Sequence, residues 1–516
     1  MSKSLKRIIS LAAALSIFVI ALAGCASGGD ANDTASTSSG SASAAGTTAA
    51  AATQAADSGK KLSGDVKLLF SGEASAAQDK VTQALVEKLK ADGLDLNLEF
   101  TFVPANDYAT KQSLIASSGE DMDVTWTHIS SIKPQIAQKM FAPLDDALKA
   151  YGPELIKNTP DYVFKEVTTQ GSIYAIPRVV PSAENDWVVS IRGDLREKYG
   201  VPEIKTLADF EAYAEALYKN EKQMTPIWLQ SPRELYRVYN PTYYFPTKGV
   251  YIDLTDKDLK VKNYYESDAY KQFCDKYYEW VQKGWATKDS TRIDLNSNDF
   301  IAGKMGTCYG NVMFPTEKID LLKGVSPEGK IETVNFNPDQ PRYITTATDN
   351  LLSVFAQSQH VNESVAFIDW IRTGQENYDL MSYGVKGVNY NLEGDSISLE
   401  GISKENAYTP KSYCWTDLRF NRYSKNVPAA YIDVIKNWDK GAIQSPLLGI
   451  SFDTAPYQEE VAKLQTVFDQ YNKLMEHGLI KFDGKKDEML AKAKAAGIDK
   501  IISEVQKQVD AFRAGK

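Results

Sequence analysis

Few residues in this chain combine a type and a spacing that would support catalysis or metal binding. Carboxylates cluster at 120–123 and 253–258, and paired carboxylates can serve as acid and base in glycoside hydrolysis. Closeness in sequence, however, does not indicate the separation across a sugar ring that this reaction requires. A single histidine, His128, is weak evidence for a proton shuttle, and we expect it to act as a hydrogen-bonding group. We therefore predict no enzyme, no metal site and no cofactor.

Composition excludes several further classes of protein. The 516-residue chain carries a net charge of −9, which argues against a nucleic-acid binder because such proteins present basic surfaces. Only three histidines and four cysteines occur, which is a poor inventory for zinc sites or a disulfide framework. Tyrosine is abundant, with 28 residues, and eight tryptophans accompany it. The length is sufficient for two or three domains.

The N-terminus has the pattern of a bacterial lipoprotein signal. Three cations precede an apolar stretch over residues 8–23, and the letters LAGC follow at 22–25. This motif resembles a lipobox, in which small residues precede a cysteine that becomes the lipidated first residue of the mature chain. We therefore predict a signal peptide at 1–24 and a lipid anchor on Cys25, which would attach the protein to the outer face of the cell membrane.

A tether follows the predicted anchor. Residues 25–61 consist mainly of alanine, serine, threonine and glycine and show no apolar periodicity. Such a segment cannot bury enough apolar surface to offset the entropy of ordering it, so we predict that it is disordered. The folded part should therefore begin near Leu62.

Apolar periodicity predicts an alternation of strands and helices at the start of the folded part. Strands are expected at 65–71, 94–102 and 122–127, with helices at 77–91 and 108–116. This β-α-β-α-β order favours a parallel, doubly wound sheet. In such sheets ligands bind beyond the carboxyl ends of the strands.

Longer motifs along the folded part carry a family resemblance. The chain resembles the extracellular solute-binding lipoproteins of ABC importers, family 1 type, in the large Firmicutes branch that has a C-terminal helical region. The motifs that carry this resemblance are SSGEDMDVTWTH, which ends at His128, GSIYAIPRVVPS at 171–182, NDFIAGKMGTCYGN at 298–311, TTATDNLLSVF at 345–355, VAFIDWIRTGQENYDLMSYGVKGVNYNLEGD at 365–395, and the tail from 445 to 512.

The resemblance implies a two-lobed α/β fold of the periplasmic-binding-protein type. Its two lobes would be joined by a hinge of several strands, with chain crossings near 174–181 and 342–352. The implied domains are an N-lobe of 62–178 plus 348–392 and a C-lobe of 179–347 plus 393–516, which includes the C-terminal helical region.

The resemblance implies that the protein captures a carbohydrate and delivers it to a permease by closure of the lobes. We expect the carbohydrate to be an oligosaccharide. The expected partners are the transmembrane subunits of an ABC permease and the membrane itself through the lipid anchor, with no nucleic acid, and the protein is expected to be a monomer. Two alternatives stay open: a receptor for a peptide or another solute, and a carbohydrate-active enzyme at the cell surface.

A carbohydrate site needs flat aromatic faces for the C–H surfaces of sugar rings and planar polar groups for their hydroxyls. For each aromatic residue the alternative is core packing, which we favour for Trp280 because it lies in a helical apolar pattern. Gly310 would let the backbone beside Tyr309 approach a ligand. The expected aromatic residues are Trp126, Trp187, Trp228, Trp285, Tyr309 and Trp415, and the expected polar residues are Glu73, Thr127, His128 and Asn311.

Overall fold

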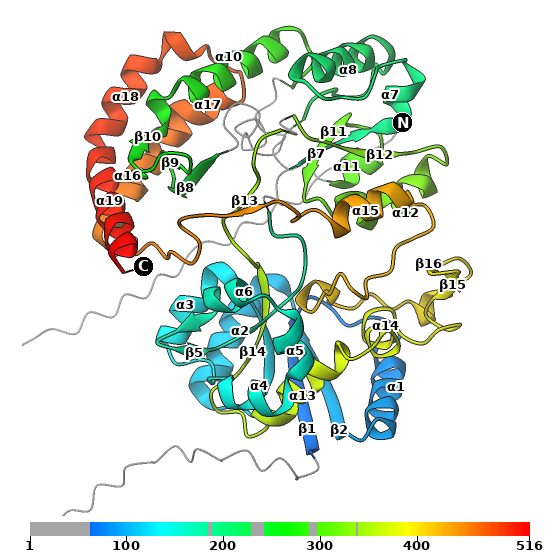
Figure 1. Cartoon of the computed structure of the whole chain (residues 1–516). Helices are drawn as coiled ribbons and strands as arrows, with labels where there is room; N and C mark the ends of the chain where they lie inside the picture. The colour runs from blue at the N-terminus through cyan, green and yellow to red at the C-terminus, as the bar shows by residue number, and fades with distance from the viewer. Residues whose placement is uncertain (1–61, 184–187, 229–241, 288–296, 337–338, 516) are drawn as a thin grey trace, which may run out of the picture. The chain divides into compact units, whose positions relative to one another are not determined.

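The computed structural model describes residues 62–183, 188–228, 242–287, 297–336 and 339–515 (Figure 1). The predicted signal peptide, Cys25 and the predicted tether lie outside the described residues, as does Trp187. The described chain forms an α/β fold of two lobes, which confirms the predicted fold class.

The predicted β-α-β-α-β order at the start of the first lobe is confirmed. Its elements are β1 (Ser63–Ser71), α1 (Gln78–Ala91), β2 (Asp95–Val103), α2 (Ala105–Ser118) and β3 (Val124–His128). Strand β1 lies between β2 and β3 and is parallel to both. The carboxyl ends of these three strands therefore meet at one edge of the sheet, as the sequence predicted.

Two strands from later in the chain complete this sheet and add antiparallel pairing to it. The strand order is β2-β1-β3-β14-β6, where β14 is Asn350–Val354 and β6 is Ile176–Pro177. Strand β14 is antiparallel to both of its neighbours. The sheet is therefore mixed, because its fourth strand arrives from a distant part of the chain and runs in the opposite direction.

Helices cover both faces of the first sheet. Alternate residues of β1 point to opposite faces, so Leu68 and Phe70 pack with α1 residues such as Leu85, whereas Leu69 packs with Ile115 of α2. The other helices of this lobe are α3 (Ile129–Ala137), α4 (Asp145–Tyr151), α5 (Pro153–Asn158), α6 (Asp161–Glu166), α13 (Val361–Ile371) and α14 (Gln375–Tyr383). Two short hairpins are β4 (Thr168–Thr169) with β5 (Ser172–Ile173) and β15 (Asn391–Glu393) with β16 (Ser396–Ser398).

The second lobe is built on antiparallel sheets. One has the order β11-β7-β12, formed by β7 (Val188–Arg192), β11 (Thr307–Gly310) and β12 (Ile331–Val334). The other has the order β10-β9-β8, formed by β8 (Tyr243–Thr247), β9 (Val250–Asp253) and β10 (Val261–Asn263). The helices beside the first of these sheets are α7 (Gly193–Lys198), α8 (Leu207–Asn220), α11 (Ser297–Ile301), α12 (Phe314–Val325) and α15 (Ala429–Lys436).

The C-terminal helices share a core with the β10-β9-β8 sheet. They are α16 (Gln458–Val467), α17 (Lys473–Glu476), α18 (Lys486–Ala495) and α19 (Ile498–Ala514), and Figure 1 shows α17 beside α10 (Asp268–Gln282). Val505 of α19 and Val261 of β10 belong to the same buried cluster as Trp280 of α10. Core packing of Trp280 is confirmed, since it is 0% exposed.

Three chain segments run together where the lobes join. The Arg178 amide donates to the Asn350 carbonyl oxygen at 3.3 Å, and the Val179 amide donates to that of Thr416 at 2.8 Å. Ser182 Oγ donates to the Ala347 carbonyl oxygen at 2.8 Å. A short parallel pair, β13 (Tyr343–Ile344) with β17 (Ile443–Gln444), adds a fourth contact between distant segments. The segments near 176–183 and 343–352 overlap the ranges 174–181 and 342–352, for which the crossings stay a prediction.

The first-lobe core also contains residues from beyond its predicted boundary at 392. Tyr408, Cys414 and Trp415 are buried in the same cluster as Phe70 of β1, and the Phe70 and Trp415 ring centroids lie 5.7 Å apart. The chain therefore still contributes to the first lobe at residue 415.

Candidate functional site

The carboxyl edge of the first sheet brings together segments that the sequence singled out. Residues 71–73, 104–106 and 126–128 lie at or just beyond the carboxyl ends of the parallel strands β1, β2 and β3, and the Gly72 amide donates to the Val103 carbonyl oxygen at 2.7 Å. Gly72 has φ 107°, and a Cβ at this position would lie 2.8 Å from Lys411 Nζ. The positive φ favours glycine at this position, whereas the flexible end of Lys411 could move aside.

Trp126 is held at this edge by contacts with two tyrosine rings and by a hydrogen bond from its polar atom. Its side chain is half-buried, and its Nε1 donates to Asn350 Oδ1 at 2.8 Å. Tyr413 meets the indole at 88° with ring centroids 5.8 Å apart, and Tyr108 lies 5.4 Å away. The indole is thus fixed before any ligand arrives, which lowers the entropy cost of stacking against it.

A polar layer supports the backbone of Trp126. The Tyr108 hydroxyl lies 2.9 Å from the Trp126 carbonyl oxygen and 2.9 Å from Thr125 Oγ1. Gln112 Nε2 donates to the same carbonyl oxygen at 2.9 Å. Burial raises the pKa of Tyr108 well above its ordinary value, so its hydroxyl stays neutral. Thr127 is also buried, and its hydroxyl donates to Gln135 Oε1.

An ion pair stands beside Trp126 where two chain crossings meet. Arg178 Nε donates to Asp349 Oδ1 at 2.6 Å, and Arg178 Nη2 donates to Oδ2 of the same carboxylate. Burial opposes ionisation of Asp349, but the charge and hydrogen bonds of Arg178 hold the pKa of Asp349 below its ordinary value. Asp349 and Asn350 are adjacent in sequence, so one short segment both pairs with Arg178 and anchors Trp126. We call Trp126, Tyr413, Asn350, Arg178 and Asp349 the rim site.

The remaining polar residues predicted at this edge have local roles or are exposed. His128 begins α3, and its Nδ1 accepts a hydrogen bond from the Ser130 amide at 3.2 Å. This is a helix N-cap. Glu73 is exposed in the loop after β1. In the second lobe, Asn311 Oδ1 accepts from the Met313 amide at 2.9 Å, which shapes the turn after β11.

Three of the predicted aromatic residues lie in the core instead. Trp415 is 1% exposed, and its Nε1 donates to Ser382 Oγ at 3.0 Å. Trp228 and Trp285 are also buried, and Trp285 Nε1 donates to Glu215 Oε2. In this structure these three rings have no free face for a ligand. Their large apolar area is buried in packing, which was the alternative for each of them.

The side chains of two predicted aromatic residues are not among those that the structure describes. Trp187 lies outside the described residues, and for Tyr309 the structure describes the backbone alone, which pairs with Val189 in the sheet. A Cβ at Gly310 would lie 2.9 Å from atoms of the Phe314 side chain, so packing of Phe314 requires this glycine.

The carboxylate clusters are occupied by structural hydrogen bonds. Asp123 is fully buried, and its two oxygens accept from the Lys67 amide at 2.8 Å and from Ser358 Oγ at 2.5 Å. Asp253 Oδ1 accepts from Thr242 Oγ1 and from Thr255 Oγ1. Within the described ranges, no group of three histidine, cysteine or acidic side chains is arranged to hold a metal ion.

Four members of the rim site escaped sequence reasoning. Asn350, Asp349 and Arg178 lie in the predicted crossings, but only the fold shows that Asn350 bonds to Trp126 and that Asp349 pairs with Arg178. Tyr413 lies two residues before Trp415, and the sequence singled out Trp415 instead. The signal that could have identified Tyr413 is its place in the middle of a short 3₁₀ turn, Ser412–Cys414, which Trp415 ends.

Among the described residues, no helix combines the length and the apolar character that crossing a bilayer requires.

Comparison with known proteins places the fold. One solved structure, described as an N-glycan transport solute binding protein (NgtS) from Streptococcus pneumoniae, matches with a TM-score of 0.72 at 20% identity over 87% of this chain and 99% of that one. Another, described as the alginate-binding protein AlgQ2 without calcium ion, matches with a TM-score of 0.59 at 17% identity, over 89% and 99% of the two chains. At these identities the likeness shows a common fold.

Sequence comparison gives the family. A curated relative from Streptococcus pneumoniae, named a carbohydrate ABC transporter substrate-binding protein, is 25% identical over 90% of this chain and 93% of its own length. A domain of unknown function matches residues 446–514, which include the C-terminal helices. The model of a bacterial extracellular solute-binding protein matches residues 84–392, more than half of the chain. The protein therefore belongs to the family of bacterial extracellular solute-binding proteins.

Proposed function

We propose that this protein captures a carbohydrate, by expectation an oligosaccharide, outside the cell and delivers it to the permease of an ABC importer. The family is one of binding proteins rather than enzymes. The curated relative is named for carbohydrate transport, and structures of similar fold are described in complex with Man5GlcNAc and with kestose. These likenesses support a sugar as the ligand.

The observation that carries the proposal is the half-buried indole of Trp126 at the carboxyl edge of the first sheet. A fixed aromatic face suits the C–H surface of a pyranose ring. The nearby Arg178–Asp349 pair offers charged hydrogen-bonding groups to hydroxyls that project from such a ring. Hydrogen bonds to charged groups are the stronger class, so stacking and polar contacts would act together on one sugar.

Closure of the lobes on the ligand is the proposed signal to the permease. Support comes from the chain segments that run together at the junction, since a bundle of extended segments can bend while each lobe keeps its own core. We place the lobe boundaries at the predicted crossings, with the first lobe extended to about residue 415 because Trp415 packs in its core. Small-angle scattering should show a smaller radius of gyration with a bound sugar than without it.

Membrane attachment through Cys25 is the second part of the proposal. It rests on the LAGC motif and on the segment of small residues behind it. Changing Cys25 to Ser should release the protein into the medium or leave the signal uncleaved. Unchanged membrane association of that variant would contradict the anchor and leave the binding function untouched.

The test of the binding function is a panel of neutral oligosaccharides titrated into the purified protein by calorimetry, with product analysis of each mixture. A binding protein should show saturable heat and return the sugar unchanged, whereas shortened products would indicate a carbohydrate-active enzyme. Binding of peptides in place of sugars would favour the other receptor class.

A further inference from the structure

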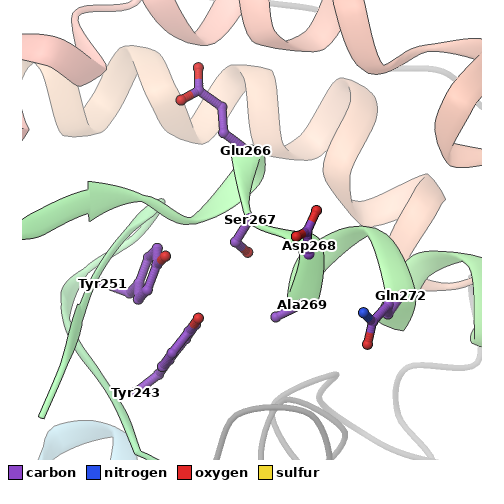
Figure 2. A pocket seen from close by; sticks show the side chains of 7 residues that line it. All are labelled: Tyr243, Tyr251, Glu266, Ser267, Asp268, Ala269 and Gln272. Carbon is purple, nitrogen blue, oxygen red and sulfur yellow. The ribbon is translucent and has the colours of Figure 1, made fainter. Parts of the chain in front are cut away.

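The second lobe contains a polar pocket that no part of the proposed function uses. It lies between strands β8 and β9 and the start of helix α10, with a cavity volume of about 460 Å³. Volumes of roughly 300–1,000 Å³ are usual for small-ligand sites. Seven side chains line it, and Figure 2 shows them. We call it the tyrosine pocket because Tyr243 and Tyr251 form one wall.

The two tyrosines of this wall are stacked on each other. Their ring centroids lie 4.2 Å apart with an interplanar angle of 24°, and Tyr264 packs edge-on against Tyr251 at 5.8 Å. Figure 2 shows both hydroxyls on the side that faces Ser267 and the start of α10. The ring faces therefore contact each other, and the two phenolic hydroxyls lie on the pocket side.

The Tyr243 hydroxyl stays neutral. Burial raises the pKa of Tyr243 well above its ordinary value, and Tyr251 and the charges of Asp253 and Asp268 raise it further. A neutral phenol both donates and accepts a hydrogen bond, which is what a sugar hydroxyl requires of its partner.

The opposite wall is polar and acidic. Ser267 Oγ accepts from the Tyr270 amide at 3.1 Å and donates to the Tyr264 carbonyl oxygen at 2.7 Å, so Ser267 fixes the first turn of α10. Asp268 and Gln272 follow one turn apart on that helix and are exposed. Among the described residues, the lining contains two carboxylates and no cationic side chain. Figure 2 shows the second carboxylate, Glu266, directed away from the tyrosines, so Asp268 dominates the charge.

We propose that the tyrosine pocket is a second sugar subsite that accepts one neutral or amine-bearing sugar residue and disfavours acidic sugars. This inference rests on the proposed function and adds a charge preference to it. Phenols, an amide and a carboxylate supply donors and acceptors for ring hydroxyls, and the carboxylate repels a uronate while attracting an ammonium group.

Three monosaccharides that differ in charge test the proposal: glucose, glucosamine and glucuronate. We would titrate each into the full folded protein at low salt and follow ligand NMR signals. Glucosamine should bind at least as well as glucose, and glucuronate should bind about threefold more weakly, the size expected for one exposed charge. Asp268→Asn should remove that difference. Asp499→Asn is the matched control, since it removes an exposed charge from the first turn of α19, outside the pocket.

A second substitution locates the binding. Tyr243→Phe keeps the stacked ring and removes one hydroxyl, so all three sugars should bind roughly two- to tenfold more weakly. Tyr218→Phe on α8 is its control, because Tyr218 is 45% exposed and does not line the pocket. Both changes are conservative, and matching thermal melts would show that each variant folds.

Defined outcomes separate this inference from the proposed function. The subsite is overturned if none of the three sugars binds, if glucuronate binds best, or if Tyr243→Phe and Asp268→Asn behave like their controls. Oligosaccharide binding that depends on Trp126 but not on Tyr243 would leave the proposed function standing and refute the subsite. Binding of the monosaccharides in the pocket without any oligosaccharide binding would support the subsite and refute the proposed function.

Discussion

The rim site and the tyrosine pocket both use aromatic residues, but they present opposite parts of them. At the rim site the polar atom of Trp126 is bonded to Asn350, and the half-buried ring remains for contact. In the tyrosine pocket the rings of Tyr243 and Tyr251 cover each other, and their hydroxyls remain. The first arrangement offers apolar contact and the second offers hydrogen bonds, so residue type alone does not define what an aromatic site recognises.

Trp415 is a fully buried aromatic residue with which both sites can be compared. Its substitution should have the largest effect on the free energy of unfolding. It is 1% exposed and packs against Phe70, so Trp415→Ala should lower the free energy of unfolding by about 3–5 kcal/mol. Chemical denaturation monitored by circular dichroism would measure the loss. A stable Trp415→Ala variant with weakened sugar binding would reverse the assignment and move Trp415 from the core to the site.

The second largest expected effect is a pH dependence of the free energy of unfolding, and it comes from Glu166. Burial raises the pKa of Glu166 to about 7, although hydrogen bonds from the Ala347 and Thr348 amides and the charge of Lys133 oppose the rise. The folded state therefore keeps the proton to a higher pH than the unfolded chain. Stability from this group is complete below the unfolded pKa near 4.5 and is lost as pH rises towards about 7.

The size of that loss is at most about 3 kcal/mol. Glu166→Gln cannot ionise, so its unfolding free energy should vary less between pH 5 and 8 than that of the wild type. Denaturation curves at several pH values would test this, with Glu363→Gln at the start of α13 as the control. Identical pH profiles for Glu166→Gln and the wild type would contradict the raised pKa.

Trp126→Ala directly tests the rim site. If the indole stacks on a sugar, the substitution should weaken binding by about 1–3 kcal/mol, and the protein should remain folded because the side chain is only half-buried. Calorimetric titration with an oligosaccharide identified in the panel measures the first effect, and a thermal melt measures the second. Full affinity in a strongly destabilised variant would assign Trp126 to the core instead.

Asn350→Ala should produce the smallest effect and sharpen the same assignment. It frees the indole N–H of Trp126 without removing the ring, so the expected loss of sugar affinity is about 1 kcal/mol. Asn350→Asp keeps an acceptor at the same position and should restore most of the affinity. A failure of this rescue would mean that Asn350 acts by a route other than positioning Trp126.

The sequence predicted the fold well where local periodicity governs it. Alternating apolar residues defined β2, and helical spacing of Val81, Leu85 and Leu89 defined α1. It did not reveal that β14 joins the first sheet antiparallel to β3, because periodicity carries no information about the partner or direction of a strand. The antiparallel sheets of the second lobe were not predicted for the same reason.

Part of the candidate site could be selected from the sequence. Trp126 was singled out because ligands bind at the ends of parallel strands in such sheets, and its contact with a ligand stays a prediction. Asn350, however, is 224 residues from Trp126, and Asp349 is 171 residues from Arg178. Contacts at such separations depend on the assembled fold. Trp415 was misassigned because a tryptophan in a loop has the same local pattern whether its ring faces a ligand or a core.

The first-lobe core unites Val66 of β1 with Trp415, and this has a consequence for how the chain is made. At roughly 5–20 residues per second, a ribosome needs on the order of 20–70 s to synthesise the stretch between them. During that interval the apolar face of the sheet has no complete cover, so the lobe cannot reach its native packing. A chain that still lacks Trp415 leaves this face open to chaperones and to aggregation.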